Sequence, residues 1–432
     1  MERSQQPATL GIDFGTSNSA AGILVNDKPY LIEVEAGKNT LPTSVFFDFE
    51  TRKTSFGSFA NTALMRGDEG RFMRSLKSVL GTSLMHEKRR MMGETLTFTD
   101  IISRFLSEVK TRAEAACHQS FDYALSGRPV HFHSNDAVKD QRALEDLKAC
   151  YLRAGFKDVQ FLYEPEAAAI ANGNLARDNS IGLIVDIGGG TSDFTVFQMR
   201  QSGARNAANR LDVIASHGVR MGGTNFDKAI SVDHVMPLFG KGSFIRTEMG
   251  KGALEAPNAM FNELATWEKI PFLYTKEMLR TVEHFRRLAL NKPLFSRLYS
   301  VLEHQLAHEV AFAVERGKIQ ANKAGSAPSK IDLGFVEPEL AAALTQENLV
   351  ASLEELAVNI QTCAIETLKM AECNAARVDT VIFVGGSSLM TVIIEAMKTL
   401  CPKAQLQHKD AFTAIVNGLA IASSNEFGKN LS

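Results

Sequence analysis

The sequence predicts a two-lobed α/β protein whose core is duplicated, and three observations predict it. The chain has 432 residues, which is enough for two or three domains. Hydrophobic residues make up 45% and charged residues 22%, the proportions of a globular chain with a sizeable buried core. Apolar segments of strand length alternate with longer segments of helical spacing, and one strand-turn-strand pattern occurs twice.

The repeated pattern is a hairpin with a glycine-rich tip. Residues 9–17 (TLGIDFGTS) form an apolar strand that ends in Asp13 and runs into a Gly-Thr-Ser turn. Residues 183–193 (LIVDIGGGTSD) repeat this plan, with Asp186 in the place of Asp13. Another apolar run follows each segment, so both are predicted to be β-hairpins. The repeat predicts two similar lobes that each offer one tip to a shared cleft.

Helices and a further strand account for much of the remaining chain. Three helices are predicted from capping residues and apolar spacing, at about residues 99–117, 136–155 and 347–372, the first capped by Thr99 or Asp100. A strand at 381–384 then runs into a pair of glycines. The segment 239–292 has no clear period, and it is predicted to be the variable part of a subdomain.

The two tips have the residue types that bind a polyphosphate. Glycines let backbone N–H groups approach phosphate oxygens, and Thr16 and Ser17 add hydroxyl donors. Three successive glycines, 188–190, weaken a strand, and close approach of a ligand is a reason to have them. Asp13 and Asp186 offer carboxylates that suit a hydrated Mg²⁺. The first tip alone is a weak signal, but the two together favour a nucleotide site.

Two further glycine pairs follow apolar runs, Gly222-Gly223 and Gly385-Gly386. One such pair is ordinary in a loop. Four glycine-rich turns together fit a nucleotide held from both lobes, with its phosphates on the first three turns and its nucleoside on the last.

Charge, hydropathy and cysteines argue against several other classes of protein. The net charge is −2, from 47 basic and 49 acidic side chains, which argues against nucleic-acid binding. No apolar run is long enough to span a membrane, and residues 1–8 lack the apolar region of a secretory signal, so a cytoplasmic protein is expected. The five scattered cysteines predict neither a disulfide framework nor a zinc site. His131 and His133 alternate on a predicted strand and are expected to be surface or satisfied side chains.

These segments resemble those of a known family. Residues 11–19 (GIDFGTSNS) and 185–193 (VDIGGGTSD) resemble the first and second phosphate loops of the Hsp70 ATPase domain. Residues 163–169 (YEPEAAA) are similar to the family's E-P-x-A-A-A segment, 221–227 (MGGTNFD) to the segment after the second loop, and 381–388 (VIFVGGSS) to the adenosine loop. Order and spacing agree along nearly the whole chain. The details look most like the truncated bacterial Hsp70-like proteins of the YegD type.

The resemblance implies a two-lobed actin-like ATPase (ribonuclease H-like) fold, with an inserted subdomain in each lobe and Mg²⁺ with ATP or ADP between the lobes. Lobe I would span 8–178, with its insertion at about 40–97, and the C-terminal helix 410–432 would complete it. Lobe II would span 179–409, with its insertion at about 226–340. Too few residues follow for a peptide-binding domain, so none is expected.

The resemblance also implies catalytic roles. Lys77 would lie beside the γ-phosphate and stabilise charge on the transferring phosphoryl group. Glu164, which Pro165 holds extended, would help to place the attacking water, with Asp193 and Thr191 near the γ-phosphate. Without the family, Lys77 would be taken for a solvated lysine and Glu164 for an acid at a helix N-terminus.

The other implied contacts are to the metal and the nucleotide. Asp13 and Asp186 would hold Mg²⁺ through water. Glu315, Lys318 and Asn322 share one face of a predicted helix where the family contacts the nucleoside, and an exposed charged face is the alternative. The predicted nucleotide-contacting residues are Gly15, Thr16, Ser17, Asn18, Gly188, Gly189, Gly190, Gly222, Gly223, Glu315, Lys318, Asn322, Gly385, Gly386, Ser387 and Asp410.

The function implied by the resemblance is that of a chaperone-related ATPase that hydrolyses ATP slowly. Its lobes would close around ATP, and a co-chaperone, exchange factor or other partner protein would recognise the nucleotide state. Two alternatives use the same pocket: an actin-like filament-forming ATPase, and a small-molecule kinase, which would need a carboxylate base for its acceptor hydroxyl. Lys77 and the 163–169 segment favour the Hsp70-like interpretation.

Overall fold

The computed structural model describes residues 8–133, 136–171, 179–199, 211–247, 252–325, 327–408 and 413–426. The chain divides into two compact units. The first unit comprises Met1–Arg220, Gln361–Leu389 and Met397–Ser432, and the second comprises Met221–Ile360 and Met390–Ala396. The predicted mixture of strands and helices is confirmed.

The first unit contains two large sheets whose strands pair in the same order. The first sheet runs β11 (Asp158–Tyr163), β10 (Tyr123–Arg128), β1 (Thr9–Phe14), β2 (Asn18–Val25) and β3 (Lys28–Leu31), with β4 (Leu41–Pro42) also paired to β2. The second runs β20 (Gln405–Gln407), β19 (Thr380–Val384), β12 (Ile181–Ile187), β13 (Ser192–Met199) and β14 (Leu211–Val219). In each five-strand path the first two pairings are parallel and the last two are antiparallel. The duplication predicted from the two hairpins is therefore confirmed.

The central strands of both sheets are apolar on both faces. β1 and β12 are buried along most of their length, as expected for strands that are covered on two sides. Asp13 and Asp186 are exceptions, because each is half-buried and stands one residue before the end of its strand. Across the second hairpin Asp186 lies directly opposite Asp193. Like charges in facing positions destabilise a sheet, so this pair calls for a functional reason.

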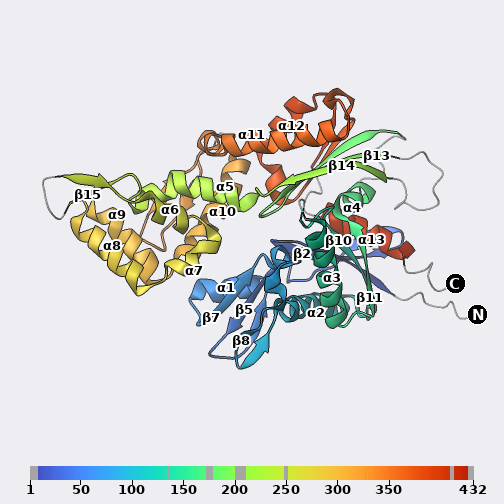
Figure 1. Cartoon of the computed structure of the whole chain (residues 1–432), viewed down its shortest axis with the longest axis horizontal. Coiled ribbons are helices and arrows are strands. Elements are labelled where there is room, and N and C mark those ends of the chain that lie inside the picture. The colour runs from blue at the N-terminus through green and yellow to red at the C-terminus, as the bar shows by residue number, and fades with distance from the viewer. Residues whose placement is uncertain are drawn as a thin grey trace, which may run out of the picture. The chain divides into compact units, whose positions relative to one another are not determined.

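Two helices pack against these sheets and against each other (Figure 1). α13 (Ala414–Glu426) contacts β1, β2 and β10, and α4 (Glu164–Ala171) contacts strands of both sheets. The apolar cluster that they share with the sheets includes Ala168, Ile184 and Leu419. This cluster joins the duplicated halves of the first unit into one core.

Gly418 lies where α13 meets α4 most closely. A Cβ atom at this position would lie 1.8 Å from the carbonyl oxygen of Ala167, which is a backbone atom. We therefore expect Gly418→Ala to lower the free energy of unfolding by about 1–3 kcal/mol, although alanine favours an isolated helix over glycine by ~1 kcal/mol. Urea unfolding measures the change. Asn417→Ala, at a half-buried position beside it, is the control and should be nearly neutral. A neutral Gly418→Ala would mean that the helix contact can widen without cost.

The helix predicted at 99–117 is α2 (Phe98–Cys117), and its predicted cap is wrong by two or three residues. Thr97 is the N-cap in place of Thr99 or Asp100, and Asp100 accepts the backbone N–H of Thr97 at 2.8 Å. Both threonines have a suitable hydroxyl. The burial of Phe98 brings it into the first turn and so selects Thr97.

The other predicted elements lie close to their expected positions. α3 (Ala137–Arg153) begins after Asp136, which accepts the N–H of Lys139 at 2.9 Å as predicted for a cap. The helix expected at 347–372 is α11 (Gln346–Met370), and the strand expected at 381–384 is β19. α12 (Thr391–Leu400) follows β19.

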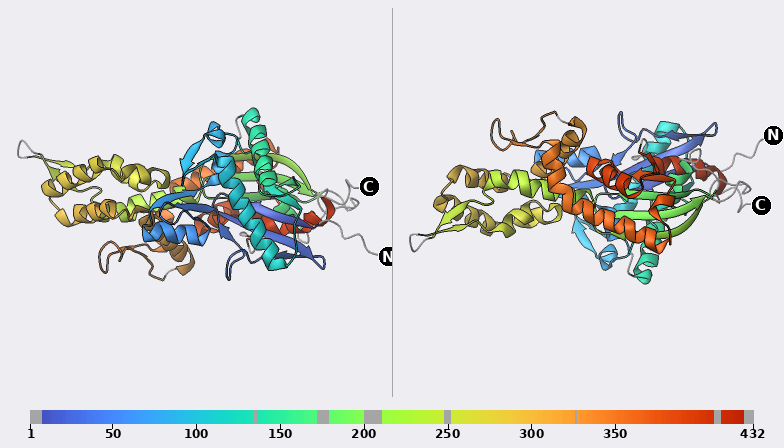
Figure 2. Two further views of the ribbon diagram at one scale, coloured as in Figure 1. Left: turned by 90° about the horizontal axis from the view of Figure 1, so that it is seen from below. Right: turned by 90° about the horizontal axis from the view of Figure 1, so that it is seen from above.

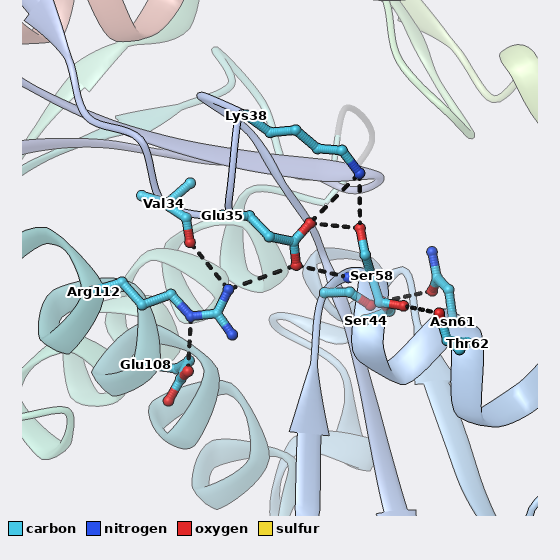
Figure 3. Close-up of polar contacts among 10 residues, drawn as sticks. Val34, Glu35, Lys38, Ser44, Ser58, Asn61, Thr62, Glu108 and Arg112 are labelled. Atoms are coloured by element: carbon cyan, nitrogen blue, oxygen red, sulfur yellow. Dashed lines mark hydrogen bonds and ion pairs between the residues drawn. The ribbon is translucent and has the colours of Figure 1, made fainter. Parts of the chain in front are cut away.

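A smaller sheet lies beside α2. It is formed by β6 (Thr54–Phe56), β5 (Ser44–Asp48) and β7 (Gly70–Arg74), it carries α1 (Ser58–Arg66), and a hairpin of β8 (Arg89–Met91) and β9 (Glu94–Leu96) follows. Gly57 at the N-cap of α1 has no side chain, and Glu35 supplies the acceptor instead (Figure 3). Its carboxylate accepts the backbone N–H of Ser58 at 3.0 Å and lies 3.6 Å from the guanidinium of Arg112. Glu35 therefore ties α1 to α2.

The second unit is mainly helical. Its elements are α5 (Gly223–Ile230), β15 (Phe244–Arg246), β16 (Ala253–Glu255), α6 (Asn258–Leu264), α7 (Ile270–Leu273), α8 (Lys276–Leu288), α9 (Lys292–Glu303), α10 (Ala307–Ala324), β17 (Lys330–Asp332) and β18 (Ala341–Ala343). α8 and α9 lie side by side (Figure 2). The segment 239–292 forms the elements from β15 to α8. Across the described ranges, no helix has both the length and the hydropathy needed to cross a bilayer.

Candidate active site

Five charged side chains gather at the tips of the two hairpins in the first unit. Lys77 comes from a 3₁₀ turn and Glu164 from the first residue of α4. Asp13, Asp186 and Asp193 come from β1, β12 and β13. Each of these three aspartates interacts electrostatically with both Glu164 and Lys77. The structure therefore brings together five residues for which the family resemblance implies roles in catalysis and metal binding.

Lys77 and Glu164 form a shielded ion pair. Their Nζ and Oε1 atoms lie 2.5 Å apart, and the exposed fractions of the two side chains are 11% and 10%. Burial by itself would lower the pKa of Lys77, but the charges of Glu164 and Asp13 outweigh burial, so the pKa is raised. Lys77 is therefore held as a cation inside an acidic cluster.

The three aspartates of the cluster resist ionisation. Burial, and after it the charge of Glu164, raises the pKa of Asp13 to about 7 and that of Asp193 to about 6. Burial and the charges of Glu164 and Asp193 hold the pKa of Asp186 well above its usual range. Four carboxylates thus share one lysine, and a further cation would stabilise their ionised forms.

A hydrated Mg²⁺ fits these donors. Magnesium prefers oxygen ligands, and it keeps several waters while it binds one or two carboxylates together with substrate phosphates. Among the residues that the structure describes, no three His, Cys, Asp or Glu side chains are grouped as direct metal ligands. Asp13 and Asp186 are the two carboxylates that the sequence predicts for contact with the ion through water.

The three glycines of the second tip differ in their packing. A Cβ atom on Gly189 would lie 2.4 Å from Oγ of Ser17, so the two tips touch at this point and only glycine fits without rearrangement. Gly188 has ordinary contact distances and Gly190 has open space at the Cβ position. Packing therefore explains one glycine of the run and does not account for the other two.

The first tip is closed by its own glycine. A Cβ atom on Gly15 would lie 2.2 Å from the carbonyl oxygen of Asn18, so the turn requires glycine. Thr16 is half-buried, whereas Asn18 and Thr191 are exposed. The side chain of Thr191 forms a hydrogen bond with Asp193, which lowers the pKa of Asp193 and partly offsets the larger effects of burial and Glu164.

The glycine pair after β19 adjoins the metal-binding candidate. Gly385 has a φ of +77°, and a Cβ atom there would lie 2.5 Å from the carbonyl oxygen of Ile187 and 3.2 Å from Oδ1 of Asp186. Gly386 is exposed and Ser387 is half-buried. The predicted nucleoside loop and the predicted metal carboxylate are thus neighbours within the first unit.

In the second unit, the predicted nucleoside face of α10 is not an exposed charged face. Lys318 is 5% exposed, and its Nζ lies 2.8 Å from Oδ1 of Asp227 on α5. Oδ1 of Asn322 accepts the backbone N–H of Thr391 at 2.8 Å, and Glu315 is half-buried. Packing and pairing hold this face in place.

The remaining predicted residues are few. Gly222 and Gly223 are buried at the start of α5, where the N–H of Gly222 donates to Oδ1 of Asn225 at 3.0 Å. Asp410 lies outside the described residues.

Sequence reasoning missed two carboxylates and misplaced a histidine. Asp227, the partner of Lys318, ends the 221–227 segment that resembles the family, but no role was predicted for it. Asp146 did give one, because it stands three residues after Ala143 and so shares the apolar face of α3. His133 lies outside any strand, contrary to the prediction, and its ring contacts a backbone carbonyl.

A family comparison decides what kind of protein carries this cluster. The Hsp70 protein family matches residues 9–256, which is more than half of the chain. The chain belongs to the Hsp70 family. Members of the Hsp70 family are nucleotide-binding ATPases related to chaperones, and the actin-like ATPase fold that the resemblance implied is that of the Hsp70 ATPase domain. The matched range contains Asp13, Lys77, Glu164, Asp186 and Asp193, whereas the predicted nucleoside residues on α10 and after β19 lie beyond it.

Proposed function

We propose that this Hsp70-family protein binds ATP or ADP with Mg²⁺ and hydrolyses ATP slowly, and that the cluster of Asp13, Lys77, Glu164, Asp186 and Asp193 does the chemistry. The observation that supports this best is the shielded Lys77–Glu164 pair at 2.5 Å within an acidic group. A buried cation beside several carboxylates is a suitable place for a charged phosphoryl group and a water molecule to react.

Each residue of the cluster has a role in the proposal. Lys77 leaves Glu164 to contact the γ-phosphate, where it stabilises the charge on the transferring group. Glu164, freed from the ion pair, orients the attacking water. Asp193, which forms a hydrogen bond with the side chain of Thr191, assists Glu164 in orienting this water. Asp13 and Asp186 would hold Mg²⁺ through water, and the bound ion would neutralise charge on the phosphates.

The proposed nucleotide contacts are those that the family resemblance implies. The phosphates would lie against the glycine-rich tips and Gly222-Gly223, where backbone N–H groups can approach them. The nucleoside would contact Glu315, Lys318 and Asn322, together with the loop that starts at Gly385, and Asp410 would complete the set.

The proposal extends to nucleotide-dependent movement. ATP would close lobe I (8–178, completed by 410–432) on lobe II (179–409), with insertions at about 40–97 and 226–340. A partner protein of the co-chaperone or exchange-factor kind would recognise the closed state. Small-angle X-ray scattering with ATP and with ADP tests the movement, and identical profiles would argue against it.

Single-turnover hydrolysis tests the proposed activity directly. The purified chain is mixed with a substoichiometric amount of ATP, Mg²⁺ and no acceptor, and phosphate release is followed with time. Slow release that is lost in Glu164→Ala is the expected result. Tight ATP binding without any release would contradict the proposal and would favour a kinase that lacks its acceptor.

Asp186→Asn is expected to weaken ATP binding in the presence of Mg²⁺ by about tenfold, because one of two carboxylates that contact the hydrated ion is lost. Affinity in EDTA should change much less. Isothermal titration calorimetry measures both values. Asp122→Asn, an exposed carboxylate paired with Lys157, is the matched control and should bind like the wild type. Equal weakening with and without Mg²⁺ would remove Asp186 from the metal site.

A further inference from the structure

The position of Lys77 depends on a short turn, residues 75–81. Leu76 and Leu80 of this turn are each only 1% exposed and belong to the main apolar core of the first unit. Lys77 lies between these two anchors and reaches Glu164. A small shift of the turn would therefore move the Lys77 ammonium group away from its partner.

Two hydrogen bonds of opposite polarity hold the end of the turn. Oδ2 of Asp146, on α3, accepts the backbone N–H of Gly81 at 2.9 Å. Nε2 of His133 donates to the carbonyl oxygen of Leu80 at 2.8 Å. The two bonds engage consecutive residues of the backbone, so the turn can neither slide nor rotate without breaking one of them.

Gly81 seats the turn directly on α3. Its φ is +75°, and a Cβ atom there would lie 2.5 Å from the carbonyl oxygen of Lys139 and 3.0 Å from Cβ of Ala143. Glycine therefore lets the backbone of the turn approach the helix to a distance that other residues do not allow.

The position of Asp146 is not explained by packing. It shares the buried face of α3 with Ala143, Leu147 and Cys150, and it is 6% exposed. A carboxylate in such a place is costly unless it is hydrogen-bonded. Its other oxygen lies 3.3 Å from Nε2 of His86, whose side chain is 66% exposed, so that contact faces solvent. The shielded hydrogen bond of Asp146 is therefore the one that it accepts from the backbone N–H of Gly81, at the end of the turn 75–81.

We infer that Asp146 is a positioning residue for Lys77: with His133 it fixes the Leu80–Gly81 backbone to α3 and thereby sets where the lysine ammonium meets the phosphoryl group. This inference rests on the proposed function, since it assumes that Lys77 acts on ATP. It adds a residue that touches neither nucleotide nor metal, yet controls the rate.

Asp146→Ala should lower the single-turnover rate constant for hydrolysis by about 10- to 100-fold, because a small displacement of a catalytic group has effects of this size. The dissociation constant for ATP should stay the same. Asp146→Asn keeps an oxygen acceptor for the Gly81 N–H and should restore most of the rate. His86→Ala removes the exposed partner and should leave the rate unchanged.

A double-mutant cycle separates positioning from general stability. In a Lys77→Ala background, Asp146→Ala should cause no further loss of rate, because the group through which it acts is already gone. Hydrogen exchange of the peptide that covers residues 77–82 should be faster in Asp146→Ala and restored in Asp146→Asn.

Several outcomes would overturn the inference. These are an equal loss from Asp146→Ala in both backgrounds, failure of Asp146→Asn to restore the rate in a folded protein, or unchanged exchange in the peptide. The proposed function fails separately, if Lys77→Ala itself leaves hydrolysis unchanged. In that case Asp146 has no catalytic lysine to position, and the inference is rejected as well. The hydrogen-exchange data would still show whether Asp146 holds the turn 75–81 in place.

Discussion

Lys77→Ala is expected to lower the single-turnover rate constant for ATP hydrolysis by about 10²–10³-fold while it changes ATP affinity far less. The reason is that Lys77 sits among carboxylates at 11% exposure, where a fixed cation stabilises developing phosphoryl charge more strongly than it could in water. Its bond to Glu164 in the structure also keeps the ammonium charged and inside the cluster before ATP binds. The rate constant is measured with the protein in excess over ATP, at a protein concentration well above the dissociation constant and with Mg²⁺ present, and affinity is measured by calorimetry.

Lys157→Ala is the matched control. Lys157 also forms an ion pair, with Asp122 at 2.8 Å, but its side chain is 66% exposed. Its removal should alter neither rate nor affinity, because exposed ion pairs contribute little. If Lys77→Ala reduced rate and affinity by the same factor, its effect would lie in binding, and the transition-state role would be rejected.

Asp13→Asn is expected to stabilise the nucleotide-free protein above pH 7. Burial and the charge of Glu164 raise the pKa of Asp13 from its usual 3.8 to about 7, so the folded state holds this proton more tightly than the unfolded state does. The folded state is therefore favoured at low pH, and this contribution is lost as the pH rises from 3.8 to about 7. A shift of this size corresponds to roughly 2–4 kcal/mol at a partly buried site.

The measurement is urea unfolding in EDTA at several values between pH 5 and pH 8. The stability advantage of Asp13→Asn over the wild type should grow up to about pH 7 and then stay constant, as the pKa of Asp13 requires. Asp122→Asn, at an exposed position, should show no such pH dependence. A destabilised Asp13→Asn at pH 8 would show that the carboxylate has a structural partner. The higher stability of Asp13→Asn should be accompanied by weaker Mg²⁺-dependent ATP binding. Residues that serve a functional site often reduce the stability of the folded protein.

Local features were predictable because their physical causes are local. Apolar strands and glycine runs indicated both hairpins, and the repeat indicated a duplicated core, which the pairing order confirms. The N-cap of α3 at Asp136 could also be predicted from the sequence. The cap of α2 was misplaced, since Thr97 and Thr99 are equally good acceptors and only the burial of Phe98 against the core distinguishes them.

The candidate site required the fold. Lys77 and Glu164 are 87 residues apart in sequence, and neither has a neighbour in sequence that predicts the pair. The exposed or buried state of Lys318 likewise depends on Asp227, which lies on another helix. Only the family resemblance pointed to these residues beforehand.

The sequence by itself determined where the chain turns tightly and which strands repeat, because periodicity and the conformational freedom of glycine act over a few residues. The tertiary structure decided which charges face one another and how far they are shielded, because these depend on segments that are distant in sequence. The raised pKa values of Asp13 and Asp193, and the seating of Gly81 on α3 beside Asp146, arise only when those segments pack together.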